Sequence, residues 1–148
     1  MPVFQFQSFN FPDHYVRHKD FVGLLTKHDD GEQGDFSFEV KNVGHDKHGV
    51  QLVVLRSVNF PDHYLRHQNF QMVLQAPTGP LDDLFLKDAT FRLEQGLADG
   101  GDPEVVSFRS VNFPDRYLRH RDFKLWLEPK DSPNLPADAT FRKTVPVD

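Results

Sequence analysis

The sequence predicts an all-β protein of the β-trefoil class, with three four-stranded repeats arranged around a pseudo-threefold axis. The first observation is the pattern S-x-N-F-P-D-x-Y-x-R-H-x-x-F, which begins at Ser8, Ser57 and Ser110. The second is that short segments of alternating apolar and polar residues, typical of half-buried strands, flank each copy. The third is that no long amphipathic helix pattern occurs. The copies start roughly 50 residues apart, so we expect a single domain over residues 1–148 with repeats near 1–48, 49–101 and 102–148.

Local patterns give the order of elements in repeat one. Residues 3–7 alternate strictly and predict a strand. Asn10-Phe11-Pro12-Asp13 predicts a tight turn, because proline fixes its own φ and Asn and Asp bond nearby backbone. We then expect a return strand at 15–18, a turn at 19–20, a third strand at 21–26, a polar loop at 27–34 and a fourth strand at 35–40.

The other two repeats contain the same elements. The expected strands are 52–57, 64–67, 71–75 and 89–94 in repeat two, and 105–111, 117–120, 124–128 and 139–143 in repeat three. The loops before the fourth strands contain Pro77, Gly79 and Pro80 in repeat two and span 129–136 in repeat three. One repeat cannot bury its apolar face alone. Three copies would close a six-stranded barrel capped by three hairpins, which leaves few exposed strand edges.

Composition limits the function classes. Fifteen phenylalanines suggest a core of aromatic rings, and the formal net charge of −5 gives a phosphate backbone no general reason to bind, so we expect no nucleic-acid partner. The absence of cysteine excludes disulfides and thiolate metal sites. No apolar run reaches the roughly 18 residues of a membrane span, and the first residues lack the pattern of a signal peptide. We therefore expect no membrane partner.

A second motif, D-x-[ST]-F, begins at Asp35, Asp88 and Asp138. Its distance from the histidine of the first motif differs between repeats, while the histidine and the aspartate both persist. This is expected if the fold brings the two residues together and leaves the loop between them free to vary.

The two motifs, with the phrase EQGLAD at residues 94–99, resemble the arabinofuranose-binding AbfB-type domain, carbohydrate-binding module family 42. The resemblance covers nearly the whole chain. It implies a non-catalytic β-trefoil that binds α-L-arabinofuranosyl side chains of arabinoxylan and arabinan through up to three pockets. It also implies an extracellular location and association with an arabinofuranosidase or another hemicellulase.

Carried over by position, the sugar contacts of the family fall on one His–Asp pair in each repeat. These pairs are His18 with Asp35, His67 with Asp88, and His120 with Asp138. An ionised aspartate can accept hydrogen bonds from two sugar hydroxyls, and a neutral histidine can donate or accept. A flat side chain suits the apolar face of the sugar, and the candidates are Tyr15, Tyr64 and Tyr117. Such pockets need no metal, no cofactor and no catalytic residue.

Other parts of the motifs have structural interpretations. We expect the phenylalanine and proline of N-F-P-D to belong to the shared core. Asp13, Asp62 and Asp115 are expected to form turns, with pairing to Arg17, Arg66 or Arg119 as an option. Repeat one departs most from the pattern, at Val16, Gly23 and Phe36-Ser37, so we expect its pocket to be the weakest.

The sequence has two alternative interpretations of function, as a glycosidase or as a protein-interaction module. A glycosidase needs two carboxylates in one asymmetric cleft, whereas every acidic motif here occurs three times. A protein-interaction module of the same fold is the alternative function, since fold alone does not assign function.

The histidines at 45 and 48 lack a third ligand nearby, and the acidic residues of 28–32 lack the spacing of a calcium loop, so we expect no metal. The sequence does not decide whether arabinan or arabinoxylan is the preferred polymer. It also does not decide whether the chain is a free-standing protein or one module of a larger enzyme.

Overall fold

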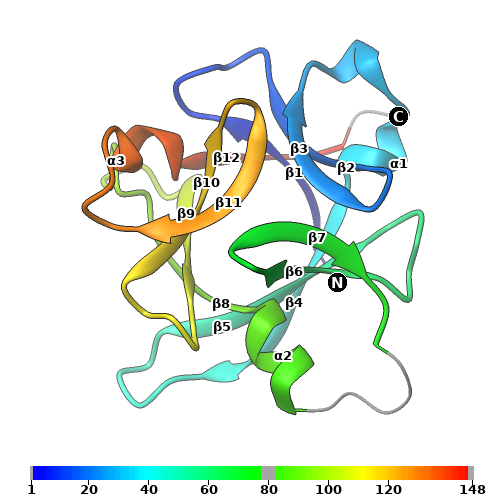
Figure 1. The fold of residues 1–148 in the computed structure, drawn as a ribbon. Helices are drawn as coiled ribbons and strands as arrows, with labels where there is room; N and C mark the ends of the chain where they lie inside the picture. The colour runs from blue at the N-terminus through cyan, green and yellow to red at the C-terminus, as the bar shows by residue number, and fades with distance from the viewer. Residues whose placement is uncertain (1, 78–82, 147–148) are drawn as a thin grey trace.

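The computed structural model describes residues 2–77 and 83–146 and shows an all-β fold (Figure 1). All described strands belong to one sheet with antiparallel pairing. They are β1 (Val3–Ser8), β2 (Tyr15–Lys19), β3 (Val22–Thr26), β4 (Phe38–His45), β5 (Gln51–Ser57), β6 (Tyr64–Gln68), β7 (Gln71–Gln75), β8 (Thr90–Gln95), β9 (Val105–Ser110), β10 (Arg116–Arg121), β11 (Lys124–Pro129) and β12 (Phe141–Thr144). The helices are short: η1 (His28–Asp30), α1 (Gln33–Phe36), α2 (Asp83–Ala89) and α3 (Leu135–Asp138). None of these helices is long and apolar enough to cross a membrane.

The strand pairings form a closed barrel. From β1 the pairing runs through β12, β9, β8, β5 and β4 and returns to β1. The remaining strands form the hairpins β2–β3, β6–β7 and β10–β11. These hairpins contact one another through β3–β7, β7–β11 and β11–β3, and Figure 1 shows them grouped around one centre. Few strand edges therefore stay unpaired.

The predicted strands agree with the observed ones within about two residues at almost every end, which is the usual uncertainty of element boundaries. The fourth strand of repeat one differs most, because residues 35–36 belong to α1 instead. The carboxylate of Asp35 accepts a hydrogen bond from the backbone N–H of Glu32 (3.3 Å), which stabilises this helical turn. Asp88 and Asp138 likewise lie at or near the ends of short helices, α2 and α3. The predicted loop positions Gly79 and Pro80 lie outside the described residues.

Aromatic and aliphatic side chains fill the barrel. The phenylalanine that ends D-x-[ST]-F is fully buried in each repeat, as Phe38, Phe91 and Phe141. The expectation that the phenylalanine of N-F-P-D also belongs to the core is wrong. Phe11, Phe60 and Phe113 are 40%, 39% and 38% exposed, because they lie in the turn after the barrel strand and outside the barrel wall.

One glycine relieves crowding where the three hairpins meet. Gly23, Met72 and Leu125 occupy the same position in the three hairpins. A Cβ built on Gly23 would lie 3.0 Å from Cδ1 of Leu125 and 3.2 Å from Cβ of Met72. The departure of repeat one from the pattern at Gly23 is therefore a packing requirement of the shared centre.

We predict that Gly23→Leu lowers the free energy of unfolding by about 1–3 kcal/mol, because a third large side chain overpacks this centre. Urea denaturation measures the change. Gly101→Leu is the control, since a Cβ there meets nothing within 4 Å and the expected effect of a surface change is within about 0.5 kcal/mol. Equal effects of the two substitutions would contradict the packing explanation.

Candidate functional site

Three hollows lie at the junctions between repeats, with volumes of about 230, 360 and 470 Å³. Each combines the hairpin and the D-x-[ST]-F aspartate of one repeat with the phenylalanine of the N-F-P-D turn of the next, and the third joins repeat three to repeat one. Hollow one is lined by Arg17, His18, Lys19, Asp20, Phe21, Asp35 and Phe60. Hollow two is lined by Arg66, His67, Gln68, Asn69, Phe70, Leu84, Asp88, Asn112 and Phe113. Hollow three is lined by Phe11, Arg119, His120, Arg121, Asp122, Phe123, Pro133, Asn134 and Asp138.

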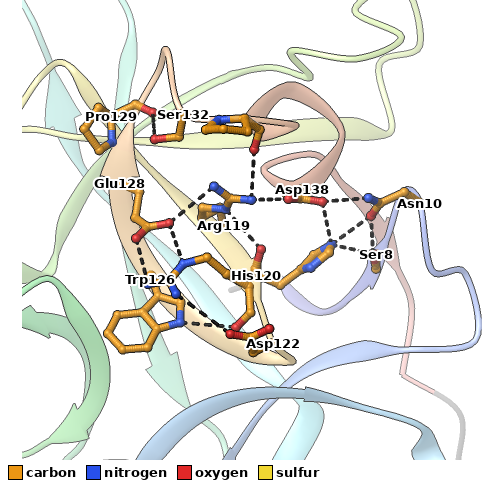
Figure 2. A network of polar contacts seen from close by, with 12 residues as sticks. Ser8, Asn10, Arg119, His120, Asp122, Trp126, Glu128, Pro129, Ser132 and Asp138 are labelled. Atoms are coloured by element: carbon orange, nitrogen blue, oxygen red, sulfur yellow. Dashed lines mark hydrogen bonds and ion pairs between the residues drawn. The ribbon is translucent and has the colours of Figure 1, made fainter.

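A polar network forms the floor of hollow three (Figure 2). The amide of Asn10 donates to Oδ1 of Asp138 (2.7 Å), and its oxygen lies 2.8 Å from Nε2 of His120. Because an amide oxygen only accepts, Nε2 of His120 carries the proton. Ser8 donates to the same amide oxygen (3.1 Å), and Arg119 donates to Oδ2 of Asp138. One asparagine side chain thus joins the histidine and the aspartate of the neighbouring repeat.

The other two hollows contain the same network. Asn59 bonds His18 (2.8 Å) and Asp35 (2.9 Å), and Asn112 bonds His67 (3.0 Å) and Asp88 (2.8 Å). The His Nε2 to Asp Oδ1 distances are 3.9, 3.3 and 3.5 Å in hollows one, two and three. The prediction that the fold brings these His–Asp pairs together is confirmed, while their contact with a sugar stays a prediction.

The asparagine of N-F-P-D is a site residue that the sequence alone did not predict. It is one of the positions identical in all three copies, which was the available signal. Its partners belong to another repeat, however, so nothing within a single repeat identifies them.

Two phenylalanines form the apolar side of hollow three. The ring of Phe11 meets those of His120 and Phe123 edge to face, with centroids 5.3 and 5.5 Å apart. Phe123 has φ +61°, and the equivalent Phe21 and Phe70 have φ +62° and +63°, in the left-handed region that bulky residues rarely adopt. The carbonyl of Phe123 accepts from the N–H of Leu25 in the neighbouring hairpin (2.9 Å), and the other two make matching bonds. Hydrogen bonds between repeats therefore hold the backbone of these phenylalanines in a strained conformation.

The three tyrosines do not line the hollows, so the structure does not bring them together with the His–Asp pairs, and their stacking on a sugar stays a prediction. Each packs against the short helix or loop that precedes the fourth strand of its own repeat. Tyr15 stacks on His28 at 3.7 Å, Tyr64 meets Phe85 edge to face, and the buried Tyr117 packs with Leu135. The flat rings that line the hollows belong to exposed phenylalanines instead.

The optional pairing of the turn aspartates with the motif arginines is not observed in repeat one. Arg17 pairs with Asp35 (2.9 Å) and Asp30 (3.0 Å). Asp13 is 2.7 Å from Nδ1 of His14, and this hydrogen bond lowers the pKa of Asp13. Arg66 and Arg119 likewise bond the aspartate of D-x-[ST]-F in their own repeats, because the loop between the two motifs folds back over the hairpin.

Burial decides the charge of the histidine in hollow three. His120 is 4% exposed, and desolvation lowers its pKa, although the carboxylate of Asp138 opposes this shift. The imidazole is therefore neutral near pH 7, with one nitrogen donating and the other available to accept. Within the described ranges, no group of three His, Asp or Glu side chains could hold a metal ion.

Comparison with known proteins identified relatives. The family described as the alpha-L-arabinofuranosidase B (ABFB) domain matches residues 4–143. A GH54 α-L-arabinofuranosidase soaked with 4-nitrophenyl α-L-arabinofuranoside is 25% identical, with a TM-score of 0.79, 97% of this chain covered and 31% of the other. An arabinofuranosidase complexed with arabinofuranosyl-α-1,2-xylobiose gives 25% identity, a TM-score of 0.79 and the same coverage of 97% and 31%. A structure named BEL β-trefoil is 14% identical, with a TM-score of 0.68, 97% of this chain covered and 92% of the other.

The chain therefore spans about a third of the arabinofuranosidases that it resembles, 31% of their length. A comparison with curated proteins found no match.

We predict that His120 makes stability depend on pH. Since the pKa of His120 is lowered in the folded chain, the unfolded chain binds a proton first, near its ordinary pKa of 6.5. The neutral His120 therefore contributes to the free energy of unfolding. This contribution is fully present above pH 6.5 and is lost as the pH falls from 6.5 through the pKa of the folded chain. Between pH 8 and pH 5, urea titrations should show a larger decrease in the free energy of unfolding for wild type than for His120→Gln. His48→Gln, an exposed control, should behave as wild type, and identical pH profiles for all three proteins would contradict the assignment.

Proposed function

Because this chain belongs to the family of the alpha-L-arabinofuranosidase B (ABFB) domain, we propose that it is a carbohydrate-binding module for α-L-arabinofuranosyl side chains of arabinoxylan or arabinan. One observation carries the proposal: the same set of polar and aromatic side chains recurs in three hollows at the repeat junctions. We further propose that the chain is one β-trefoil domain of three repeats, and that each hollow is one sugar site.

The chemistry of each hollow suits a furanoside. The aspartate is fixed by an arginine and an asparagine, yet its oxygens retain lone pairs that can accept from sugar hydroxyls. Such hydrogen bonds to a charged group are stronger than neutral ones. The asparagine has a second N–H to donate, and the exposed phenylalanine rings can cover the apolar face of the sugar. The binding residues proposed for hollow three are His120, Asp138, Asn10, Phe11 and Phe123.

The module acts without catalysis in this proposal. Asp138 already accepts hydrogen bonds from Arg119 and Asn10, an environment that suits the binding of hydroxyls better than proton transfer. The arabinofuranosidases that match are about three times longer, so a hydrolase domain attached to the module would supply the reaction. An extracellular location, where plant-cell-wall polymers occur, fits this role. Three weak sites on one branched polymer would raise the overall affinity through effective concentration.

We predict that Asp35→Asn, Asp88→Asn and Asp138→Asn each disable one hollow. Losing a hydrogen bond to a charged group costs about 1.5–3 kcal/mol, so affinity at the altered site should fall roughly 10- to 100-fold. Calorimetric titration with arabinofuranosyl-α-1,2-xylobiose would show this as a reduced number of sites. Asp13→Asn, which removes an exposed carboxylate, is the control. If wild type binds no ligand while its unfolding is cooperative, the protein-interaction alternative replaces this proposal.

We also predict that the purified chain releases no arabinose or 4-nitrophenol from 4-nitrophenyl α-L-arabinofuranoside. Absorbance of 4-nitrophenolate measures the release. Turnover that is lost in Asp138→Asn would assign catalysis to hollow three and overturn the non-catalytic proposal.

A further inference from the structure

Repeat three differs from the other two at the edge of its hollow. Its hairpin has Arg121, Trp126 and Glu128 at positions where repeat one has Lys19, Leu24 and Thr26, and repeat two has Gln68, Val73 and Gln75. Trp126 is the only tryptophan of the chain. The repeat symmetry is therefore broken by an arginine, an aromatic ring and a carboxylate in one place.

Arg121 contacts both of the other two side chains. The guanidinium of Arg121 lies over the ring of Trp126, 4.6 Å from its centroid. Nε and Nη2 of Arg121 donate to the two oxygens of Glu128 at 3.0 and 2.9 Å. The indole N–H of Trp126 donates to the carbonyl of Arg121 (3.2 Å). The plane of the guanidinium is thus fixed, and among the described residues the polar contact of Nη1 is with the exposed carboxylate of Asp122 at 3.9 Å.

This group continues the wall of hollow three. Arg121 lines the hollow directly. Trp126 is paired with Arg119 across the β10–β11 hairpin, so the two side chains share one face of the sheet. Figure 2 shows Trp126 and Glu128 on one side of Arg119, and Asp138 and Asn10 on the other. Hollow three is also the largest of the three, at about 470 Å³.

Repeat two has a different arrangement at the same place. There a separate hollow of about 180 Å³ is lined by Arg66, Gln68 and Gln75 among others. The hairpin of repeat two has neutral amides at the positions of Arg121 and Glu128, and Val73 at the position of Trp126. Two of the three hairpins thus fold without the Arg–Trp pair. An exposed cation–π contact contributes little to stability, so hairpin stability alone is a weak reason for it.

From this geometry we infer that Arg121 and Trp126 form a second subsite of hollow three, which contacts the sugar to which a terminal arabinofuranosyl group is attached. The inference rests on the proposed function. The guanidinium offers free N–H donors at Nη1 to sugar hydroxyls, and the indole adds an apolar surface beside it. Asp122 and Glu128 balance the arginine charge, so a neutral sugar suits the subsite better than an anionic one. Hollow three therefore distinguishes a branched polymer from a free monosaccharide.

The test compares two ligands in the full chain, using the fluorescence of the single tryptophan to report on hollow three. Wild type is titrated with methyl α-L-arabinofuranoside and with arabinofuranosyl-α-1,2-xylobiose. We expect the xylobiose ligand to bind hollow three more tightly and to shift the emission of Trp126. Arg121→Gln, which introduces the residue of repeat two, should lower the affinity ratio of the two ligands at least fivefold. Lys19→Gln, the matched change in repeat one, should leave the ratio at hollow three unchanged.

A second variant, Trp126→Leu, introduces the residue of repeat one and is followed by calorimetry. We expect it to lose the same preference while keeping affinity for the monosaccharide. If wild type binds both ligands and both variants keep the wild-type ratio, the subsite is refuted and the proposed function stands. If wild type binds neither ligand by calorimetry, the proposed function fails and the subsite with it. Urea denaturation of each variant separates a loss of preference from a loss of folding.

Discussion

The structure depends on one hydrogen-bonding arrangement, in which an asparagine side chain of one repeat joins the histidine and the aspartate of the repeat before it. Asn10, Asn59 and Asn112 each bond both partners, and Asn10 closes the circle by reaching repeat three. These three histidines are at most 5% exposed, so removal of the asparagine would take away the shortest hydrogen bond of a buried donor, at a cost of about 0.5–1.5 kcal/mol. The contact that holds the repeats together is therefore also the floor of each hollow.

This double role explains why the hollows are preorganised. The bonds of Asp138 with Arg119 and Asn10 fix the carboxylate before any ligand arrives. The neighbouring hairpin holds the backbone of Phe123 in a left-handed conformation, and its ring packs against those of Phe11 and His14. Side chains that are ordered in the free protein lose little conformational entropy on binding, which favours useful affinity in a shallow site. A change to these residues will therefore affect stability and binding together.

The three repeats are equal where the barrel requires it and unequal elsewhere. Phe38, Phe91 and Phe141 are equivalent and fully buried. At the centre of the hairpins, in contrast, three equal large side chains would not fit, and Gly23 leaves room for Met72 and Leu125. The edges of the hollows differ for another reason. Side chains there lie outside the packed barrel, so core packing does not constrain them, and repeat three can have Arg121 and Trp126 where the other repeats have no aromatic residue.

The sequence by itself determined the all-β class, nearly all strand positions and the His–Asp pair of each repeat. It could do so because alternation, turn chemistry and a threefold repeated motif are local signals, and because His120 and Asp138 recur at matching positions in each copy. Only the tertiary structure decided which side chains face the hollows. Tyr117 and Phe113 are both repeated aromatic residues, yet the tyrosine packs under α3 and the phenylalanine lies 38% exposed beside hollow two. The partner of each asparagine could not be inferred either, because the junction between two repeats is a property of how the barrel closes and has no counterpart in a single repeat.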